Sequence, residues 1–254
     1  MAFFEKRKQF IHLFAIAVFL ILVVTACDKT DHPIEDEPDA ETVKDIDGNK
    51  YNTIKIGSQV WTVENLKTTR YNDGTEITNV TSGSQWGNLT TGAYCNYDNL
   101  ESNAVTYGRL YNWHAVNTGK LAPAGWHVPT NEEWVTLESY LLNNGYNYDG
   151  SSSFYYFGKA LAADTGWQFS NKVGSVGNTD YPEYRNKSGF SALPGGKRSP
   201  DGTFSEIGYS GYWWTNTTNG SNFALYRNIW FGEIGFGRAS NFKKMGQSVR
   251  CIKD

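Results

Sequence analysis

The clearest local signal in the chain is the stretch WHVPTNEEW at residues 126–134, which predicts the start of a helix. Thr130 and Glu133 have the spacing of a capping box, in which the hydroxyl accepts from one free amide and the carboxylate from another. Leu137 and Leu141 follow the last tryptophan at i+3 and i+7, on the same helix face. We therefore predict a helix that begins after Thr130 and packs this face into a core.

Working outward from that helix, the flanking sequence alternates between strand and turn signals. Residues 50–63 predict a hairpin, with Gly57 opening a two-residue type II′ turn. Apolar spacing predicts an earlier helix over residues 107–116. Aromatic and β-branched runs between glycine-bearing turns predict strands at 209–217, 223–231 and 248–252. Two helices in the first half and antiparallel strands mainly in the C-terminal half indicate an α+β fold.

The first residues have the features of a secretory signal. A short basic segment (Lys6, Arg7, Lys8) precedes an apolar run of 15 residues from Phe10 to Val24, which is shorter than the ~20 residues that span a bilayer. Small residues then lead into Cys27, and this pattern resembles the lipobox of bacterial lipoproteins. The resemblance implies a signal peptide at 1–26 and acyl chains on Cys27 that anchor the protein in a membrane. An ordinary secretory signal with a chance cysteine is the alternative.

Residues 27–47 are expected to form an acidic tether between this anchor and the domain. After Cys27 they hold nine acidic residues against two lysines, together with Pro33 and Pro38. High net charge with few large apolar residues is typical of disorder. Acidic residues shortly after a lipidated cysteine also resemble, loosely, the surface-export signal of Bacteroidetes lipoproteins. We expect an outer membrane lipoprotein, displayed at the cell surface or facing the periplasm.

Residues 48–254 are expected to form one domain. They contain 18 basic and 16 acidic residues, a net charge of +2. Such a nearly neutral domain has no general attraction for nucleic acid, so no nucleic-acid partner is expected. Its Cys95 and Cys251 would face an oxidising compartment, which favours a disulfide between them over two buried free thiols.

Aromatic residues make up 15% of the chain, and several fall in loop-like segments rich in glycine and asparagine. Rings exposed on a rigid scaffold often bind ligands, and the C–H face of a sugar stacks on them. Core packing is the alternative explanation for any one ring. The candidate ligand-binding residues are Trp167, Tyr181, Tyr184 and the strand residue Trp213.

A series of short motifs, taken in order, resembles one family. They are GSQVW with ENL (residues 57–66), GRLYNW (108–113), WHVPT with EW (126–134), GF with LPGG (189–196), YWWT (212–215) and SVRC (248–251). Together they resemble the Fibrobacter succinogenes major paralogous domain family over nearly all of residues 45–254. Members are typically lipoproteins or cell-surface proteins, and no general activity is assigned to the family.

The same motifs resemble, more distantly, the formylglycine-generating sulfatase-modifying proteins, which implies a C-type-lectin-like fold. That oxidase chemistry needs a pair of cysteines near the C-terminus, whereas this chain has Cys251 alone there. Calcium-lectin ligands are also missing from Trp214-Thr215-Asn216, and His114 and His127 lack a third ligand at metal spacing. We expect no catalytic residues, no metal and no cofactor.

The sequence therefore favours a membrane-anchored surface lipoprotein with a non-enzymatic domain that binds carbohydrate or another cell-surface ligand. A structural or adhesive component of an envelope assembly, with protein partners, is the alternative. An enzyme acting on polysaccharide is the least favoured hypothesis, because no motif pairs two carboxylates or supplies a nucleophile.

Overall fold

The computed structural model describes residues 41–152 and 154–254. The predicted signal peptide, the lipidated Cys27 and most of the predicted tether lie outside these residues. The chain from Pro38 to Asp254 forms one compact unit, and this unit contains all three hydrophobic core clusters. Because it holds its own cores, it is self-contained in the sense that defines a domain.

The largest sheet joins the two ends of this unit. Its strands run in the order β1-β2-β3-β13-β7, with bounds β1 Thr42–Lys44, β2 Lys50–Ile56, β3 Gln59–Thr62, β7 Trp126–His127 and β13 Ile252–Lys253. The β2–β3 pair is the predicted hairpin, and Gly57 in its turn has a φ of 63°. Every pairing in this sheet is antiparallel.

The predicted tether ends earlier than expected, because residues 42–47 belong to the folded domain. β1 pairs with β2, so the chain is already part of the sheet at Thr42. The carboxylate of Asp45 accepts hydrogen bonds from the Tyr51 hydroxyl (2.6 Å) and the Asn49 side chain (2.8 Å). Asp45 closes a tight turn between β1 and β2. Composition alone does not distinguish an acidic residue with this role from one in a charged tether.

Three smaller sheets complete the β-structure. They contain β10, β11 and β12, then β4, β5 and β6, then β8 and β9. The bounds are β4 Thr78–Asn79, β5 Ala93–Cys95, β6 Leu110–Tyr111, β8 Gly195–Arg198, β9 Phe204–Ile207, β10 Ser210–Asn219, β11 Phe223–Trp230 and β12 Gly237–Phe242. β4 and β5 run parallel, whereas the other pairs are antiparallel. The predicted strands at 209–217 and 223–231 are confirmed, and the one at 248–252 is reduced to its last residue.

Within the described residues the helices are short apart from one. They are α1 Gly83–Gly87, α2 Glu101–Tyr107, α3 Trp113–Val116, α4 Asn131–Asn143 and α5 Gly158–Leu161, with 3-10 helices η1 Tyr97–Asn99 and η2 Pro182–Tyr184. α4 is the predicted capped helix, and Thr130 and Glu133 form both bonds of the capping box. The architecture is α+β with mostly antiparallel strands. None of these helices is both long and apolar enough to cross a membrane.

The helix predicted over residues 107–116 is wrong in its middle. Gly108 has a φ of 76° and ends α2. Leu110 and Tyr111 then form β6 against β5, and the Asn112 side chain caps the new helix α3. The apolar spacing there arises from a strand flanked by two helical turns, which tertiary pairing stabilises over one continuous helix.

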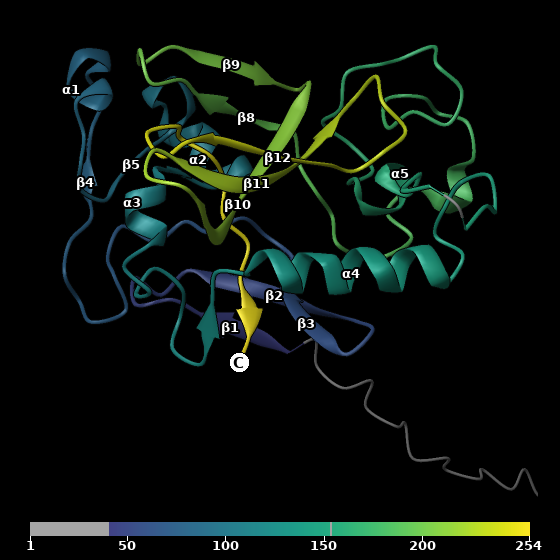
Figure 1. The fold of residues 1–254 in the computed structure, drawn as a ribbon, viewed down its shortest axis with the longest axis horizontal. Coiled ribbons are helices and arrows are strands. Elements are labelled where there is room, and N and C mark those ends of the chain that lie inside the picture. Colours follow the sequence, from purple (N-terminus) through teal and green to yellow (C-terminus); the bar gives the residue numbers. More distant parts are fainter. Residues whose placement is uncertain (1–40, 153) are drawn as a thin grey trace, which may run out of the picture. The chain divides into compact units, whose positions relative to one another are not determined.

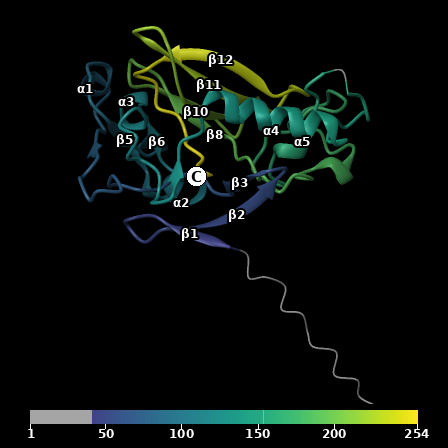
Figure 2. The ribbon, with the colours of Figure 1, turned by 60° about the horizontal axis from the view of Figure 1, so that its bottom comes forward.

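One face of α4 closes the central core. Figures 1 and 2 show α4 between the β2–β3 hairpin and the β10–β12 sheet. The ring of Trp134 lies 4.8 Å from that of Trp61 in β3 and 5.8 Å from that of Phe190. On the sheet side, the buried guanidinium of Arg227 in β11 pairs with Glu138 at 2.5 Å. The helix is thus held by aromatic packing on one side and a buried ion pair on the other.

A buried polar network joins four segments that lie far apart in the sequence. The side-chain oxygen of Asn65 accepts from Trp213 Nε1 (2.8 Å) and from Arg250 Nε (2.7 Å). Its amide nitrogen donates to the carbonyl of Tyr107 at 2.7 Å. Asn65, Trp213 and Arg250 are all nearly inaccessible to solvent, so bulk water does not compete for these hydrogen bonds.

We expect Asn65→Ala to lower the free energy of unfolding by at least about 2 kcal/mol, because it leaves buried donors of Trp213 and Arg250 unpaired. Urea unfolding of residues 38–254, followed by tryptophan fluorescence, measures this change. Asn143→Ala, at an exposed position of α4, is the matched control and should alter stability by less than about 0.5 kcal/mol. Equal effects of the two substitutions would contradict the role given to Asn65.

His127 in β7 links the start of α4 to the residue that follows β13. Its Nδ1 lies 2.6 Å from Asp254 Oδ1, and its Nε2 lies 2.8 Å from Glu133 Oε1. Burial opposes the charged imidazole, but hydrogen bonds to Asp254 and Glu133 outweigh it and raise the pKa of His127 above 6.5. The charged form is therefore stabilised in the folded state.

This pKa direction predicts a pH-dependent stabilisation. A group whose pKa rises on folding stabilises fully below its unfolded value of about 6.5 and loses that effect as the pH rises through the folded pKa. The stability difference between the native protein and His127→Gln should therefore shrink from pH 5.5 to pH 8.5. Urea unfolding at several pH values checks this, and a difference that grows with pH would refute it.

Candidate functional site

Trp213 lies in the core, where its ring is not accessible to a ligand, in contrast to the surface position that its prediction as a site residue required. The ring is fully buried, and its Nε1 donates to Asn65. Residues Ser210 to Thr215 of β10 are all buried, because the core covers both faces of this part of the strand. Side chains alternate between the two faces of β10, but both faces are covered here, so neither Trp213 nor Trp214 reaches the surface.

The predicted disulfide is also not present. Cys95 and Cys251 are both free and buried. Cys95 packs in the cluster around Trp86, whereas Cys251 packs in the cluster around Tyr111. The two thiols lie in separate cores, and burial raises the pKa of the Cys95 thiol to about 12. They behave as small apolar side chains, the alternative that the sequence had left open.

The three remaining candidate rings have different surroundings. Trp167 packs against the central core and donates from Nε1 to the carbonyl of Ala192 at 3.2 Å. Tyr184, in η2, lies under the ammonium group of Lys187 at 4.5 Å. Tyr181 is 38% exposed. Of the three, Tyr181 presents the freest ring to solvent.

Tyr181 belongs to a chain of rings that leads to a surface groove. Its ring lies 5.0 Å from Tyr148, which lies 6.3 Å from Tyr156. Tyr156 in turn stacks on Phe154 at 5.2 Å with an interplanar angle of 17°. Tyr156 also lines a cavity of about 390 Å³, which we call the aromatic groove. The structure thus brings one predicted residue close to a site that the sequence analysis did not name.

The aromatic groove lies where strand β11 ends and the turn to β12 begins. Its lining consists of Tyr156, Asn228, Trp230, Glu233 and residues 234–237. Trp230 is 41% exposed. The side chain of Asn228 makes no hydrogen bond within the described residues, whereas the carboxylate of Glu233 pairs with Lys172. The aromatic surface of Trp230 therefore lies beside the Asn228 amide, which is free to bond a ligand, and the Glu233 carboxylate.

Hydrogen bonds fix this turn between two long loops. The amides of Val176 and Gly177 donate to the carbonyls of Glu233 (3.0 Å) and Phe231 (2.7 Å). From the other side, the amide of Gly158 donates to the carbonyl of Ile234 at 3.2 Å. Figure 1 shows the β11–β12 turn among the loops near α5. The groove is rigid because its backbone groups are paired with neighbouring segments.

A buried lysine holds the loop that carries Tyr181. Lys159 in α5 donates from Nζ to the carbonyls of Asn178 (2.7 Å) and Asp180 (2.6 Å) and to Asp180 Oδ1 (2.6 Å). The other oxygen of Asp180 accepts from the Gly174 amide at 2.7 Å. Burial lowers the pKa of Lys159, although its bond to Asp180 opposes this. The ammonium group therefore acts as a structural tie between α5 and this loop.

Two of the groove residues, Asn228 and Trp230, could have been recognised from the alternation of buried and exposed side chains along β11. Arg227 and Ile229 are buried, so Asn228 and Trp230 point to the other face of the strand. A glycine-rich turn follows directly, and Gly237 leaves room for Asn228, since a Cβ there would come within 2.4 Å of its Oδ1. Tyr156 had no comparable signal, because its position depends on how a long loop folds back.

Within the described residues, no group of three or more His, Cys, Asp or Glu side chains is arranged to hold a metal ion. The acids near the groove do not form a pair of free carboxylates, since Glu233 binds Lys172 and Asp180 binds Lys159. The arrangement can stack on a flat apolar face and hydrogen-bond to hydroxyl groups beside it.

Comparison with known proteins identifies the class of domain that carries this groove. The family described as the Fibrobacter succinogenes major domain matches residues 54–253. The chain therefore belongs to the Fibrobacter succinogenes major domain family. No curated protein and no solved structure matches the chain.

Proposed function

We propose that this chain is a lipid-anchored surface protein whose domain binds carbohydrate in the aromatic groove without catalysing a reaction on it. The observation that carries the proposal is the exposed Trp230 beside Tyr156 and the uncommitted amide of Asn228. Binding sites commonly combine apolar and aromatic walls with a few polar groups that fix orientation. Sugars present both an apolar C–H face and hydroxyl groups to such a site.

The ring arrangement supports an extended ligand rather than a single small molecule. Trp230 lies 5.0 Å from Phe231, whose ring meets that of Tyr209 edge-on at 5.2 Å. From Tyr156, a second row of rings leads to Tyr148 and Tyr181. Tyr156 and Trp230 line the cavity, and the rings in contact with them extend the aromatic surface away from it, as a chain of sugar units would require.

The membrane anchor rests on the sequence and completes the proposal. Cys27 follows a basic segment and an apolar run of signal-peptide length. β1 begins at Thr42, which leaves only a short acidic segment between the proposed lipid and the domain. We also propose, from the order of the motifs alone, that the fold is C-type-lectin-like.

Cys27→Ala should abolish acylation and release the protein from the membrane fraction, because the acyl chains supply the membrane affinity. Expression in a bacterium with metabolic labelling by an alkynyl fatty acid measures this directly. Cys95→Ala, which leaves the proposed anchor intact, is the matched control and should stay labelled. Equal labelling of the Cys27→Ala variant would overturn the anchor.

Trp230→Ala should weaken glycan binding by at least about tenfold, which corresponds to about 1.4 kcal/mol. Affinity electrophoresis of residues 38–254 in xylan, mannan, β-glucan and pectin gels, with a glycan array, measures binding. Phe223→Ala is the matched control, because Phe223 is another exposed aromatic of the same strand, at its other end. Circular dichroism would show that both variants fold.

The outcomes separate the alternatives. Binding that survives EDTA and depends on Trp230 supports a metal-independent carbohydrate-binding module. Binding that EDTA abolishes would contradict the expectation of no metal. Failure to bind any glycan would refute the proposal and favour a structural part of an envelope assembly, for which crosslinking on intact cells is the next experiment.

A further inference from the structure

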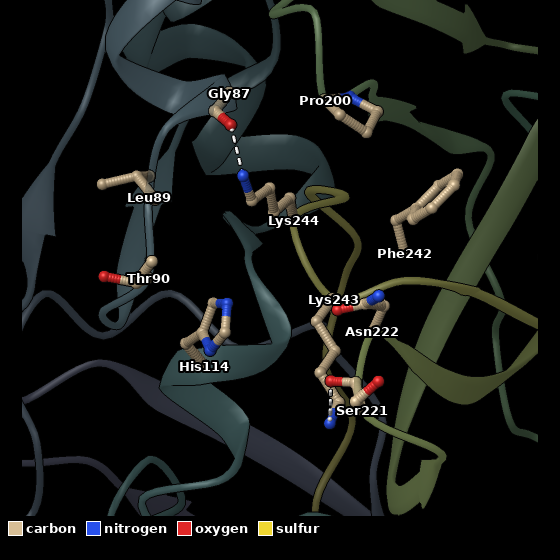
Figure 3. Close-up of a pocket in the computed structure, with 10 residues that line it drawn as sticks. All are labelled: Gly87, Leu89, Thr90, His114, Pro200, Ser221, Asn222, Phe242, Lys243 and Lys244. Carbon is tan, nitrogen blue, oxygen red and sulfur yellow. Dashed lines mark hydrogen bonds between the residues drawn. The ribbon is translucent and has the colours of Figure 1, made fainter.

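A second cavity, of about 460 Å³, lies where the end of α1, helix α3, the β8–β9 turn, the β10–β11 turn and the residues after β12 come together (Figure 3). Its lining includes three basic residues, His114, Lys243 and Lys244, and three apolar residues, Leu89, Pro200 and Phe242. No aspartate or glutamate is among the described residues that line it. The cavity therefore combines positive charge with an apolar wall.

Hydrogen bonds to the backbone hold the two lysines in place. Lys244 Nζ donates to the carbonyl of Gly87 at 2.7 Å. Lys243 Nζ donates to the carbonyls of Gly220 (3.1 Å) and Ser221 (2.9 Å) and lies 4.5 Å from the ring of Trp113. An ammonium group has three donors, so Lys244 keeps two and Lys243 keeps one for a ligand. Neither lysine is neutralised by a carboxylate in the described part of the chain.

His114 supplies a third polar group to the same cavity. Figure 3 shows its ring on α3, with the ammonium group of Lys244 pointing toward Gly87 and that of Lys243 pointing toward Ser221. Neither ring nitrogen makes a hydrogen bond within the described residues. Burial, followed by the charges of Lys243 and Lys244, lowers the pKa of His114 below its usual value. The two lysines thus disfavour the charged imidazole of His114, and an anion placed beside it would offset that effect.

We propose that this cavity binds an oxyanion group, a carboxylate or a sulfate or phosphate ester, carried by a small ligand with an apolar face. The oxyanion accepts hydrogen bonds from Lys244 and His114, and the ammonium group of Lys243 adds a second positive charge near His114. The apolar face of the ligand packs on Phe242, which is 49% exposed, and on Leu89. Charge-assisted hydrogen bonds of this kind are about twice as strong as neutral ones.

This site is distinct from the aromatic groove. Phe242 pairs with Phe223 at one end of the β11–β12 ladder, whereas Gly237 pairs with Asn228 at the other end. Five residue steps separate Phe223 from Asn228, which is about 17 Å at roughly 3.3 Å per residue. The anion site therefore does not depend on the proposed carbohydrate binding, and either can fail alone.

The two histidines of the compact unit provide the test, because His127 is bound to two carboxylates and serves as an internal control. NMR spectra of the imidazole groups in residues 38–254, recorded from pH 5 to pH 9, give both pKa values. Sodium sulfate and sodium acetate are compared with sodium chloride at the same ionic strength, so that screening is equal. We expect an oxyanion to raise the pKa of His114 by about half a unit and to leave that of His127 unchanged.

Lys244→Met should at least halve this shift, while Lys55→Met, at an exposed position of β2, should leave it intact. A larger shift with sulfate identifies a tetrahedral ester as the ligand group, and a larger shift with acetate identifies a carboxylate. Three results would overturn the proposal: no shift of His114, equal shifts of His114 and His127, or a full shift in Lys244→Met.

Discussion

The fold depends on a buried guanidinium that has no carboxylate partner among the residues that the structure describes. Arg250 is fully buried, and it donates to the Asn65 side chain and to the carbonyls of Thr62, Phe190 and Ser191 at 2.7–3.0 Å. Its cost of desolvation is large, and burial lowers its pKa to about 9. Only a set of backbone dipoles in fixed positions can offset that cost. The hairpin, the turn at residue 190 and the C-terminal segment must therefore all be in place together.

This constraint explains why the family could be recognised from the sequence. The motif residues Trp61, Trp134, Phe190 and Trp213 lie in one core cluster, and Arg250 lies 4.7 Å from the ring of Phe190. The capped helix and the hairpin were predictable because local spacing determines them. The recognisable motifs thus specify the scaffold, and none of their rings is part of the aromatic groove.

Contacts between distant segments also explain why the sequence did not predict the residues of the aromatic groove. Trp213 and Trp230 both lie in strands, but β10 is buried on both faces around Trp213, whereas β11 leaves the face of Trp230 open. Which faces are covered depends on contacts between distant segments. Tyr156 and His114 reach their cavities through loops and short helices, whose paths are determined by tertiary packing. The predicted disulfide between Cys95 and Cys251 was wrong for the same reason, because tertiary packing places the two thiols in separate core clusters.

The position of β13 between β3 and β7 has a consequence for folding kinetics. The hydrogen bond from Arg250 to Thr62 spans 188 residues, and contacts of such long range slow folding. A chain that emerges N-terminus first cannot bury Asn65 and Trp213 with their partners until residue 250 has also emerged. For a protein that is exported unfolded, as the proposed lipoprotein would be, this delay leaves the chain unfolded until almost its whole length has been synthesised.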